Sequence, residues 1–220
     1  MNEKRTLGEI VEDCKEIDKS LSDKNVCFTG HRSQKLPWGF NENDVRCIIT
    51  RLKVYKSILR AIENGKRHFI SGMALGFDMM CAEIVLELKK RNKGIILECA
   101  IPCKGQESRW PIDEQKRYKK ILKRADKIRC IYDSYTPECL HERNQYMVNV
   151  SSQVIALFDG KPGGTKKTID YAKQIGKEIE IIKPKDDFDI SSEEELMLKE
   201  RGLSYEAGKI IKIKYHHKKK

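Results

Sequence analysis

The sequence lacks several patterns that would identify a common enzyme class. No CxxC pair occurs among the eight cysteines, and the closest two are Cys99 and Cys103, so we expect neither a zinc site nor a disulfide framework. No GxxxxGK[ST] motif is present, which argues against a P-loop ATPase. No GxGxxG motif follows the first expected strand, which argues against a standard dinucleotide dehydrogenase, and no HExxH or other paired-ligand spacing indicates a metal enzyme. We expect no metal and no cofactor apart from a nucleotide-like ligand.

Long apolar runs are also absent. No stretch of 18 apolar residues exists, so no membrane span is expected. Residues 1–20 are charged and polar and lack the apolar core of a signal peptide, which favours a cytoplasmic protein. With 220 residues, 39% hydrophobic and 35% charged, the chain is long enough for one domain with a full core.

The net charge of +11 is typical of a protein that binds nucleic acid, but much of the excess positive charge lies at the C-terminus. Six of the last twelve residues, 209–220, are lysine. Such a tail is usually a solvated end, and the alternative is a non-specific contact for nucleic acid or acidic membrane. No aromatic residues interleave with the lysines as a base-stacking platform requires.

Apolar runs alternate with amphipathic stretches through the middle of the chain, which predicts an α/β fold. Right-handed crossovers then give a Rossmann-like parallel sheet of about six strands with helices on both faces, and we expect the strand order 3-2-1-4-5-6. Cys27, Cys99 and Cys130 are expected in buried strands. The expected strands are 25–29, 67–71, 95–101, 127–132, 153–158 and 178–182, and the expected helices are 43–64, 75–91, 112–125, 138–151 and 165–175.

Three segments follow from this pattern. Residues 1–24 have apolar positions spaced by three and four, which predicts an amphipathic helix packed on the domain, and this helix is a candidate interface for a homo-oligomer. Residues 25–184 form the Rossmann-like domain. Residues 185–220 form a C-terminal extension with a helix that starts at Ser191, a short strand near Ile210 and the lysine-rich tail.

Three of the apolar runs end in a glycine-bearing turn that leads into a helix. The turns lie within residues 26–32 (VCFTGHR), 69–78 (FISGMALGFD) and 155–165 (IALFDGKPGGT). A strand, a glycine turn and a helix N-terminus together point backbone N–H groups at one spot that favours an anion. Three such turns on one sheet predict a phosphate-bearing, nucleotide-derived ligand.

Particular side chains in these turns suit such a ligand. Arg32 can bind phosphate oxygens through two N–H groups, and Asp78 can contact a ribose or act as a general base. Arg143 lies early in the helix before strand 5 and can reach the ligand, because strand 4 is expected to end next to the switch point of the sheet. Plainer interpretations are a surface ion pair for Arg32, helix capping for Asp78 and an exposed charge pair for Arg143. The full predicted ligand-binding set is Thr29, Gly30, His31, Arg32, Ser71, Gly72, Gly76, Asp78, Arg143, Asn144, Asp159, Gly163, Gly164 and Thr165, with Thr165 also a candidate N-cap.

These segments, together with Pro102, Gln106, Trp110 and residues 142–148 (ERNQYMV), resemble the YpsA-like branch of the SLOG superfamily, over about residues 25–183. That group includes the DNA-processing protein DprA and the "lonely guy" proteins. The resemblance implies a Rossmann-like domain that binds nucleotides or ADP-ribose-like molecules. The "lonely guy" enzymes use a PGGxGTxxE motif, whereas this chain has Lys166 and Lys167 within it and Asp170 in place of the glutamate.

Three functions remain open at this point. The first is binding of a nucleotide derivative by a sensor or signalling module. The second is nucleotide N-glycosidase activity, with Asp78 or Asp170 as the catalytic carboxylate. The third is single-stranded DNA binding, suggested by the resemblance to DprA and by the net charge.

Overall fold

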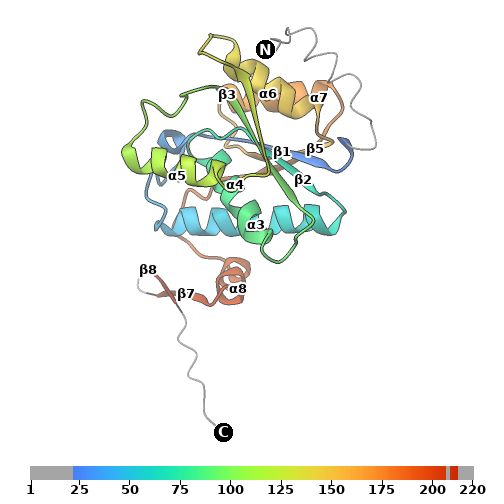
Figure 1. Cartoon of the computed structure of the whole chain (residues 1–220). Helices are drawn as coiled ribbons and strands as arrows, with labels where there is room; N and C mark the ends of the chain where they lie inside the picture. The colour runs from blue at the N-terminus through green and yellow to red at the C-terminus, as the bar shows by residue number, and fades with distance from the viewer. Residues whose placement is uncertain (1–21, 207–208, 213–220) are drawn as a thin grey trace.

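Six parallel strands form the centre of the computed structural model, which describes residues 22–206 and 209–212 (Figure 1). The strands of this sheet are β1 Asn25–Gly30, β2 His68–Ser71, β3 Ile96–Cys103, β4 Lys127–Tyr132, β5 Gln153–Leu157 and β6 Glu178–Ile182. The helices are η1 Ser33–Lys35, α3 Val45–Glu63, α4 Phe77–Leu88, α5 Ile112–Leu122, α6 Cys139–Asn149, α7 Gly164–Gln174 and α8 Ser192–Glu200. The predicted six-stranded, Rossmann-like sheet is confirmed, whereas nearly all of the predicted N-terminal helix, and the tail beyond residue 212, lie outside the described residues.

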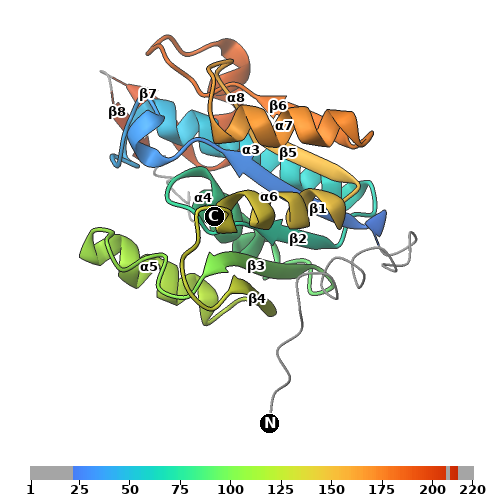
Figure 2. The same cartoon turned by 90° about the horizontal axis from the view of Figure 1, so that it is seen from above.

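Helices cover both faces of the sheet (Figure 2). The side chains of β1 point alternately to the two faces and pack against different helices on each. Val26 and Phe28 point into a core shared with α3, α4 and α5. Cys27 points to the opposite face, where it packs with Met147 of α6 and Ala172 of α7. Successive residues of a strand face opposite sides, so continuous apolar strands at the sheet centre are buried on both faces.

The predicted strand order is wrong. The order is β4-β3-β2-β1-β5-β6, so β5, and not β4, pairs with β1. The chain runs outward from β1 to β4 with α3, α4 and α5 on one face, and then α6 returns it across the other face to β5. Strands are added on one side of β1 up to β4 and on its other side from β5 onward. The position between β1 and β5 is therefore the topological switch point, where open α/β sheets bind ligands.

β4 lies at the edge of the sheet, which also corrects the expectation for Cys130. Lys127, Ile128, Arg129 and Cys130 are all exposed, so Cys130 is not in a buried strand. The two cations within this six-residue strand are typical of an edge, where charged side chains reach water and discourage pairing with another chain.

The C-terminal segment packs onto α3. Met197 and Leu198 of α8 join Val45 and Ile49 of α3 in a small apolar cluster. β7 Leu203–Glu206 and β8 Lys209–Lys212 follow as an antiparallel hairpin. The predicted helix start at Ser191 is confirmed by a capping box with Glu194. No described helix combines the length and apolar character needed to cross a bilayer.

Glu194 also anchors α8 through charge. Lys53 Nζ lies 2.9 Å from Glu194 Oε1, and Lys185 Nζ lies 3.1 Å from Oε2. Burial alone would raise the pKa of Glu194, but the two lysines and the Ser191 backbone N–H lower it to about 2. Because this pKa is lower than in the unfolded chain, the ionised carboxylate stabilises the fold above about pH 4.5, and the stabilisation is lost as the pH falls through about 2.

We therefore expect Glu194→Gln to lower the free energy of unfolding by about 2–3 kcal/mol at pH 7. Glutamine keeps the length of the side chain and can still accept the Ser191 N–H, so only the charge is removed. Urea unfolding at pH 7 and at pH 3 measures the effect, and the gap between variant and wild type should be smaller at pH 3. Equal stability at pH 7 would show that the two lysines contribute nothing through this carboxylate.

Candidate functional site

Most of the predicted ligand-binding residues meet at the carboxyl edge of β1, β2 and β5. They line a cavity of about 330 Å³, called here the phosphate pocket. Its predicted members are Thr29, Gly30, His31, Arg32, Asp78, Arg143, Asn144, Gly163, Gly164 and Thr165. Phe28, Lys35, Ala74 and Leu140 complete the lining. Ser71, Gly72, Gly76, Asp159 and Asp170 do not line it.

One wall of the phosphate pocket is the N-terminus of α7. Gly163 is the N-cap with φ +154°, and no side chain caps this helix end. A Cβ built on Gly164 would meet no atom within 4 Å, so the space above the first turn is open. Free N–H groups at a helix N-terminus, together with the helix dipole, favour an anion. Thr165 lies inside the helix, so its prediction as the N-cap is wrong.

Two cationic side chains, Arg32 and Lys35, line the pocket together with the N-terminus of α7. Arg32 and Lys35 are exposed, and neither forms an ion pair within the described part of the chain. The Lys35 Nζ lies 3.6 Å from the position a Cβ on Gly163 would take. Arg32 is therefore not the surface ion pair of the plainer interpretation. Lys35 was missed by sequence reasoning, although it follows Arg32 by one turn of η1.

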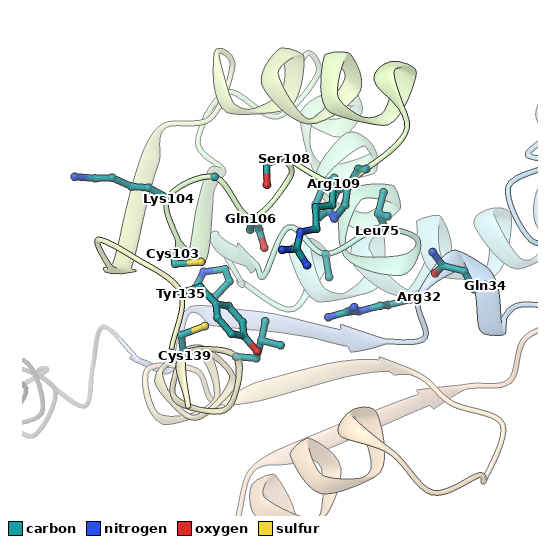
Figure 3. Close-up of a pocket in the computed structure, with 15 residues that line it drawn as sticks. Arg32, Gln34, Leu75, Cys103, Lys104, Gln106, Ser108, Arg109, Tyr135 and Cys139 are labelled. Carbon is teal, nitrogen blue, oxygen red and sulfur yellow. The ribbon is translucent and has the colours of Figure 1, made fainter. Parts of the chain in front are cut away.

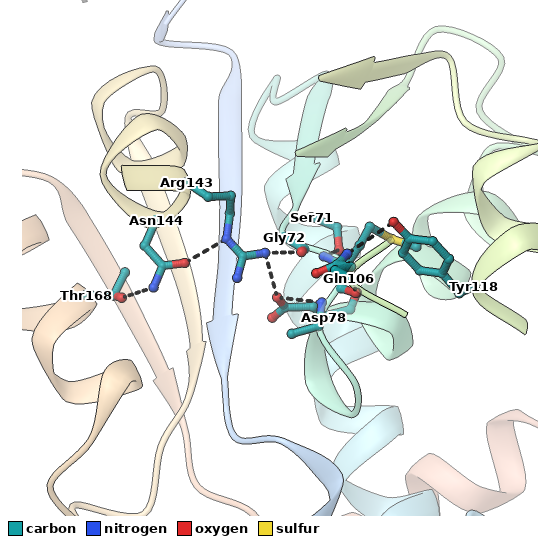
Figure 4. A network of polar contacts seen from close by, with 10 residues as sticks. Ser71, Gly72, Asp78, Gln106, Tyr118, Arg143, Asn144 and Thr168 are labelled. Carbon is teal, nitrogen blue, oxygen red and sulfur yellow. Dashed lines mark hydrogen bonds and ion pairs between the residues drawn. The ribbon is translucent and has the colours of Figure 1, made fainter. Parts of the chain in front are cut away.

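A buried polar network forms the floor between α4 and α6 (Figure 4). Arg143 extends from α6 and donates to the Gly72 carbonyl, with its Nη1 3.8 Å from Asp78 Oδ2. Its Nε donates to Asn144 Oδ1 at 2.9 Å, and the Asn144 amide donates to Thr168 Oγ1 at 3.0 Å. The network thus joins the β2–α4 turn to α7 through α6.

The central pair of this network is almost fully enclosed. Asp78 is 5% exposed and Arg143 is 4% exposed, so Arg143 is not the exposed charge of the plainer interpretation. Burial raises the pKa of Asp78, against the opposing effect of Arg143. Burial likewise lowers the pKa of Arg143, although Asp78 opposes this. Each charge is costly to bury alone, so the pair depends on its mutual attraction and its hydrogen bonds.

Ser71, Gly72 and Met73 shape the turn that holds Asp78. Ser71 Oγ donates to the Asp78 carbonyl at 2.8 Å and accepts from the Met73 N–H at 3.2 Å. A Cβ on Gly72 would lie 2.1 Å from Arg143 Nη1, so only glycine leaves room for the guanidinium. Met73 has a φ of +56°, a conformation that costs a non-glycine residue energy; residues held in such conformations cluster at active sites and ligand-binding segments.

Two predicted glycines are needed for packing within the fold. A Cβ on Gly30 would lie 2.3 Å from the Phe77 ring, so this position is already filled by a side chain. Gly76 has φ +92°, and a Cβ there would lie 2.6 Å from the Ser33 backbone nitrogen. Both glycines let the first turn of α4 pack against the chain that leaves β1.

His31, which lines the pocket, forms a partly buried contact with Asp159. His31 Nε2 lies 2.8 Å from Asp159 Oδ1. Burial alone would raise the pKa of Asp159, but Lys161 and His31 lower it to about 2. This carboxylate orients His31 and tightens the turn after β5. Asp170 is different, because it is exposed on α7 and pairs with Lys166 at 2.5 Å.

A larger cavity of about 620 Å³ adjoins the phosphate pocket (Figure 3). The two share Arg32, Ala74 and Leu140 in their linings. Sequence reasoning assigned no role to most of its walls, although Gln106 and Trp110 belong to the segments that carry the resemblance. The further lining residues are Gln34, Leu75, Pro102, Cys103, Lys104, Gly105, Gln106, Ser108, Arg109, Trp110, Tyr135 and Cys139.

Neither cavity offers a cluster of metal ligands. Among the described residues, no three His, Cys, Asp or Glu side chains gather closely enough to hold a metal ion. The joined cavities carry Arg32, Lys35, Lys104, Arg109 and Arg143, against one lining carboxylate, Asp78. The described surface is therefore suited to an anionic ligand of nucleotide size.

Comparisons with known proteins agree with this architecture. The chain is 30% identical to the uncharacterized SPbeta prophage-derived protein YoqJ of Bacillus subtilis, over 64% of this chain and 94% of that protein. It is 31% identical to a UPF0398 protein of Halalkalibacterium halodurans, over 79% of this chain and 95% of that protein.

The fold is similar to that of DNA processing protein A (DprA) from Helicobacter pylori, with a TM-score of 0.51 and 18% identity over 74% of this chain and 68% of that one. DprA from Streptococcus pneumoniae matches with a TM-score of 0.46 and 15% identity over 73% of this chain, which spans half of that protein. A family model described as the YspA SLOG family, YpsA, matches residues 26–186. The chain therefore belongs to the YpsA family of SLOG proteins.

Proposed function

We propose that this protein binds a nucleotide-derived ligand, an ADP-ribose-like molecule or a nucleoside phosphate, as a sensor or signalling module. The observation that carries the proposal is the N-terminus of α7, which no side chain caps and which is open to space above Gly164. Arg32 and Lys35 line the same pocket as this helix end. Backbone N–H groups and two cations that converge on one space form an anion site. A phosphate group fits this chemistry best, because it can accept several hydrogen bonds at once.

The buried network supports the proposal by holding the site rigid. Arg143 and Asn144 link the floor of the phosphate pocket to Thr168 on α7, so the helix end that receives the phosphate is fixed relative to β2. A preorganised site loses less entropy on binding. Asp78 faces the same cavity and is the group we assign to a ribose hydroxyl.

Calorimetric titration with AMP, ADP-ribose and NAD tests the proposal. We expect at least one of them to bind wild-type protein, and we expect Arg32→Ala and Lys35→Ala each to weaken binding by about tenfold or more, as for other hydrogen bonds to charged groups. Lys173→Ala removes the same charge from the far end of α7 and is the matched control. If none of the three ligands binds, or if the control weakens binding equally, the proposal is wrong.

Single-stranded DNA is the second candidate ligand. The structure of H. pylori DprA was described for a single-stranded DNA binding mode, and the cavities here carry an excess of cations that suits a phosphate backbone. A fluorescent oligonucleotide titrated at two salt concentrations measures this activity. Binding that weakens with salt and is displaced by AMP would place DNA in the same cleft, whereas undisplaced binding would assign it elsewhere.

N-glycosidase activity receives less support from the geometry. Asp170 is exposed, pairs with Lys166 and does not line the phosphate pocket. Asp78 lines the pocket, but it accepts from the Ala74 N–H at 3.3 Å and lies beside Arg143. Release of free base from nucleoside monophosphates, abolished by Asp78→Asn, would be required to promote this hypothesis.

A further inference from the structure

The larger cavity has a charge arrangement that binding of a single phosphate does not explain. Arg32 stands where the two cavities meet, and Arg109 enters the larger one from the loop before α5. Figure 3 shows both side chains directed into the same space, with Tyr135 across from them. No carboxylate lines this cavity, and Arg109 forms no ion pair with any residue that the structure describes.

Two guanidinium groups that face one cavity repel each other, and an anion bound between them offsets this repulsion. Lys104, the third cation of the lining, is exposed and pairs with Asp133 at 2.5 Å. Arg32 and Arg109 are therefore the two lining cations that form no ion pair within the described residues. Arginine binds phosphate oxygens through two parallel N–H groups. The larger cavity therefore offers a second anion site, next to the one at α7.

The remaining walls suit a flat, partly apolar group. Leu75 and Pro102 line the cavity together with the rings of Trp110 and Tyr135. Trp110 is fixed edge-on against Tyr118, with ring centroids 5.4 Å apart and planes at 82°. Aromatic side chains of this kind stack on nucleobases. At about 620 Å³, the cavity has the size of a small-molecule site.

Resting on the proposed function, we infer that the ligand is a diphosphate-linked nucleotide rather than a nucleoside monophosphate. One phosphate binds at α7 with Lys35, the adjacent phosphate binds between Arg32 and Arg109, and the group beyond it lies against Trp110 and Tyr135. Arg32 belongs to both cavities, so one guanidinium can contact both phosphates when they lie close together, as the two phosphates of a diphosphate do. A phosphodiester in single-stranded DNA separates its phosphates by a nucleoside and fits this shared contact less well.

Titrations of wild type and Arg109→Gln with three ligands test the inference. The ligands are AMP, ADP-ribose and the 5′-phosphorylated dinucleotide pTpT. We expect ADP-ribose to bind wild type at least about tenfold more tightly than AMP, the gain typical of a charged hydrogen-bonded pair. Arg109→Gln should lower the affinity for ADP-ribose nearly to that for AMP and leave the AMP affinity unchanged. The control Lys173→Ala should change neither the ADP-ribose affinity nor the AMP affinity.

The outcomes separate this inference from the proposed function. If AMP binds with the Lys35 dependence described above but ADP-ribose gains nothing from Arg109, the diphosphate inference is wrong and the phosphate pocket stands. If pTpT alone gains from Arg109, the second phosphate comes from a nucleic acid strand, and the inference is again overturned. If no ligand binds, the proposed function itself fails.

Tryptophan fluorescence gives an independent readout of the larger cavity. The chain has two tryptophans, and Trp38 is buried in the core cluster. We expect ADP-ribose, but not AMP, to change the emission of wild-type protein, and we expect Trp110→Phe to abolish that change. An unchanged spectrum on saturation with ADP-ribose would contradict placement of the ligand against Trp110.

Discussion

Gly164→Asp is expected to abolish ligand binding while leaving the fold intact. The new carboxylate would stand at the N-terminus of α7, where the phosphate is proposed to lie, and would take up the same N–H groups and repel the ligand. We expect at least about a hundredfold loss of affinity, because a helix-end anion site is lost and a like charge is added. Calorimetric titration of ADP-ribose measures the loss.

The structure offers a closely matched control at the same position. A Cβ on Gly164 would meet no atom within 4 Å, so Gly164→Ala adds the backbone constraint without the charge. Alanine is a better helix former than glycine, so this variant should be as stable as wild type or slightly more stable, and it should bind normally. If Gly164→Ala lost binding as completely as Gly164→Asp, steric exclusion rather than phosphate recognition would explain both results.

Arg143→Met is expected to cause the largest loss of stability among the site variants. Methionine fills part of the space but removes the only ion-pair partner of Asp78 within the described residues, and it leaves the Gly72 carbonyl without this donor. Breaking a buried ion pair on one side typically costs about 3–5 kcal/mol. Urea unfolding followed by circular dichroism should show that decrease in the free energy of unfolding.

The pH dependence of this loss identifies its cause. In the variant, burial would raise the pKa of Asp78 further, because the largest opposing effect, that of the Arg143 guanidinium, would be gone. A raised carboxyl pKa penalises the fold above the unfolded pKa of about 3.9, and the penalty disappears as protonation restores neutrality at lower pH. The loss caused by Arg143→Met should therefore be larger at pH 8 than at pH 5. A loss that is equal at both pH values would point to lost packing instead.

The partner variant Asp78→Asn separates charge from shape on the other side of the pair. Asparagine has the same size, so it removes the negative charge and leaves Arg143 buried and unpaired. We expect the double variant Asp78→Asn with Arg143→Met to be more stable than the sum of the single losses predicts, because residues in contact are coupled. Additive losses would show that the two side chains act independently.

The sequence predicted which residues lie at the site, but it did not predict the strand order that brings them together. Arg143 was expected near the ligand because strand 4 was placed beside β1, but β4 lies at the sheet edge. α6 brings Arg143 back across the sheet to Gly72. The charged residues Lys127 and Arg129 in β4 were the available signal for an edge strand. Apolar periodicity predicts where the helices and strands lie in the chain. The order in which the strands pair depends instead on which crossover helix carries the chain back to the other side of β1.

Roles within the turns also depended on the folded structure. Gly30 was assigned to ligand approach and lines the pocket, and the structure adds that its missing side chain makes room for Phe77. Asp170 was a catalytic candidate, yet helical geometry places it four residues from Lys166 on an exposed face. Lys35 and Arg109 belong to no glycine motif, so only their positions around the cavities reveal them.

By itself, the sequence determined the α/β class, the helix and strand content of residues 25–182 and the glycine turns that end strands β1, β2 and β5. These features are local, because they follow from apolar spacing and from the backbone freedom of glycine. Only the tertiary structure decided the strand order, the burial of Asp78 against Arg143 and the joining of two cavities at Arg32. Those features depend on contacts between residues far apart in the chain, which no local pattern encodes.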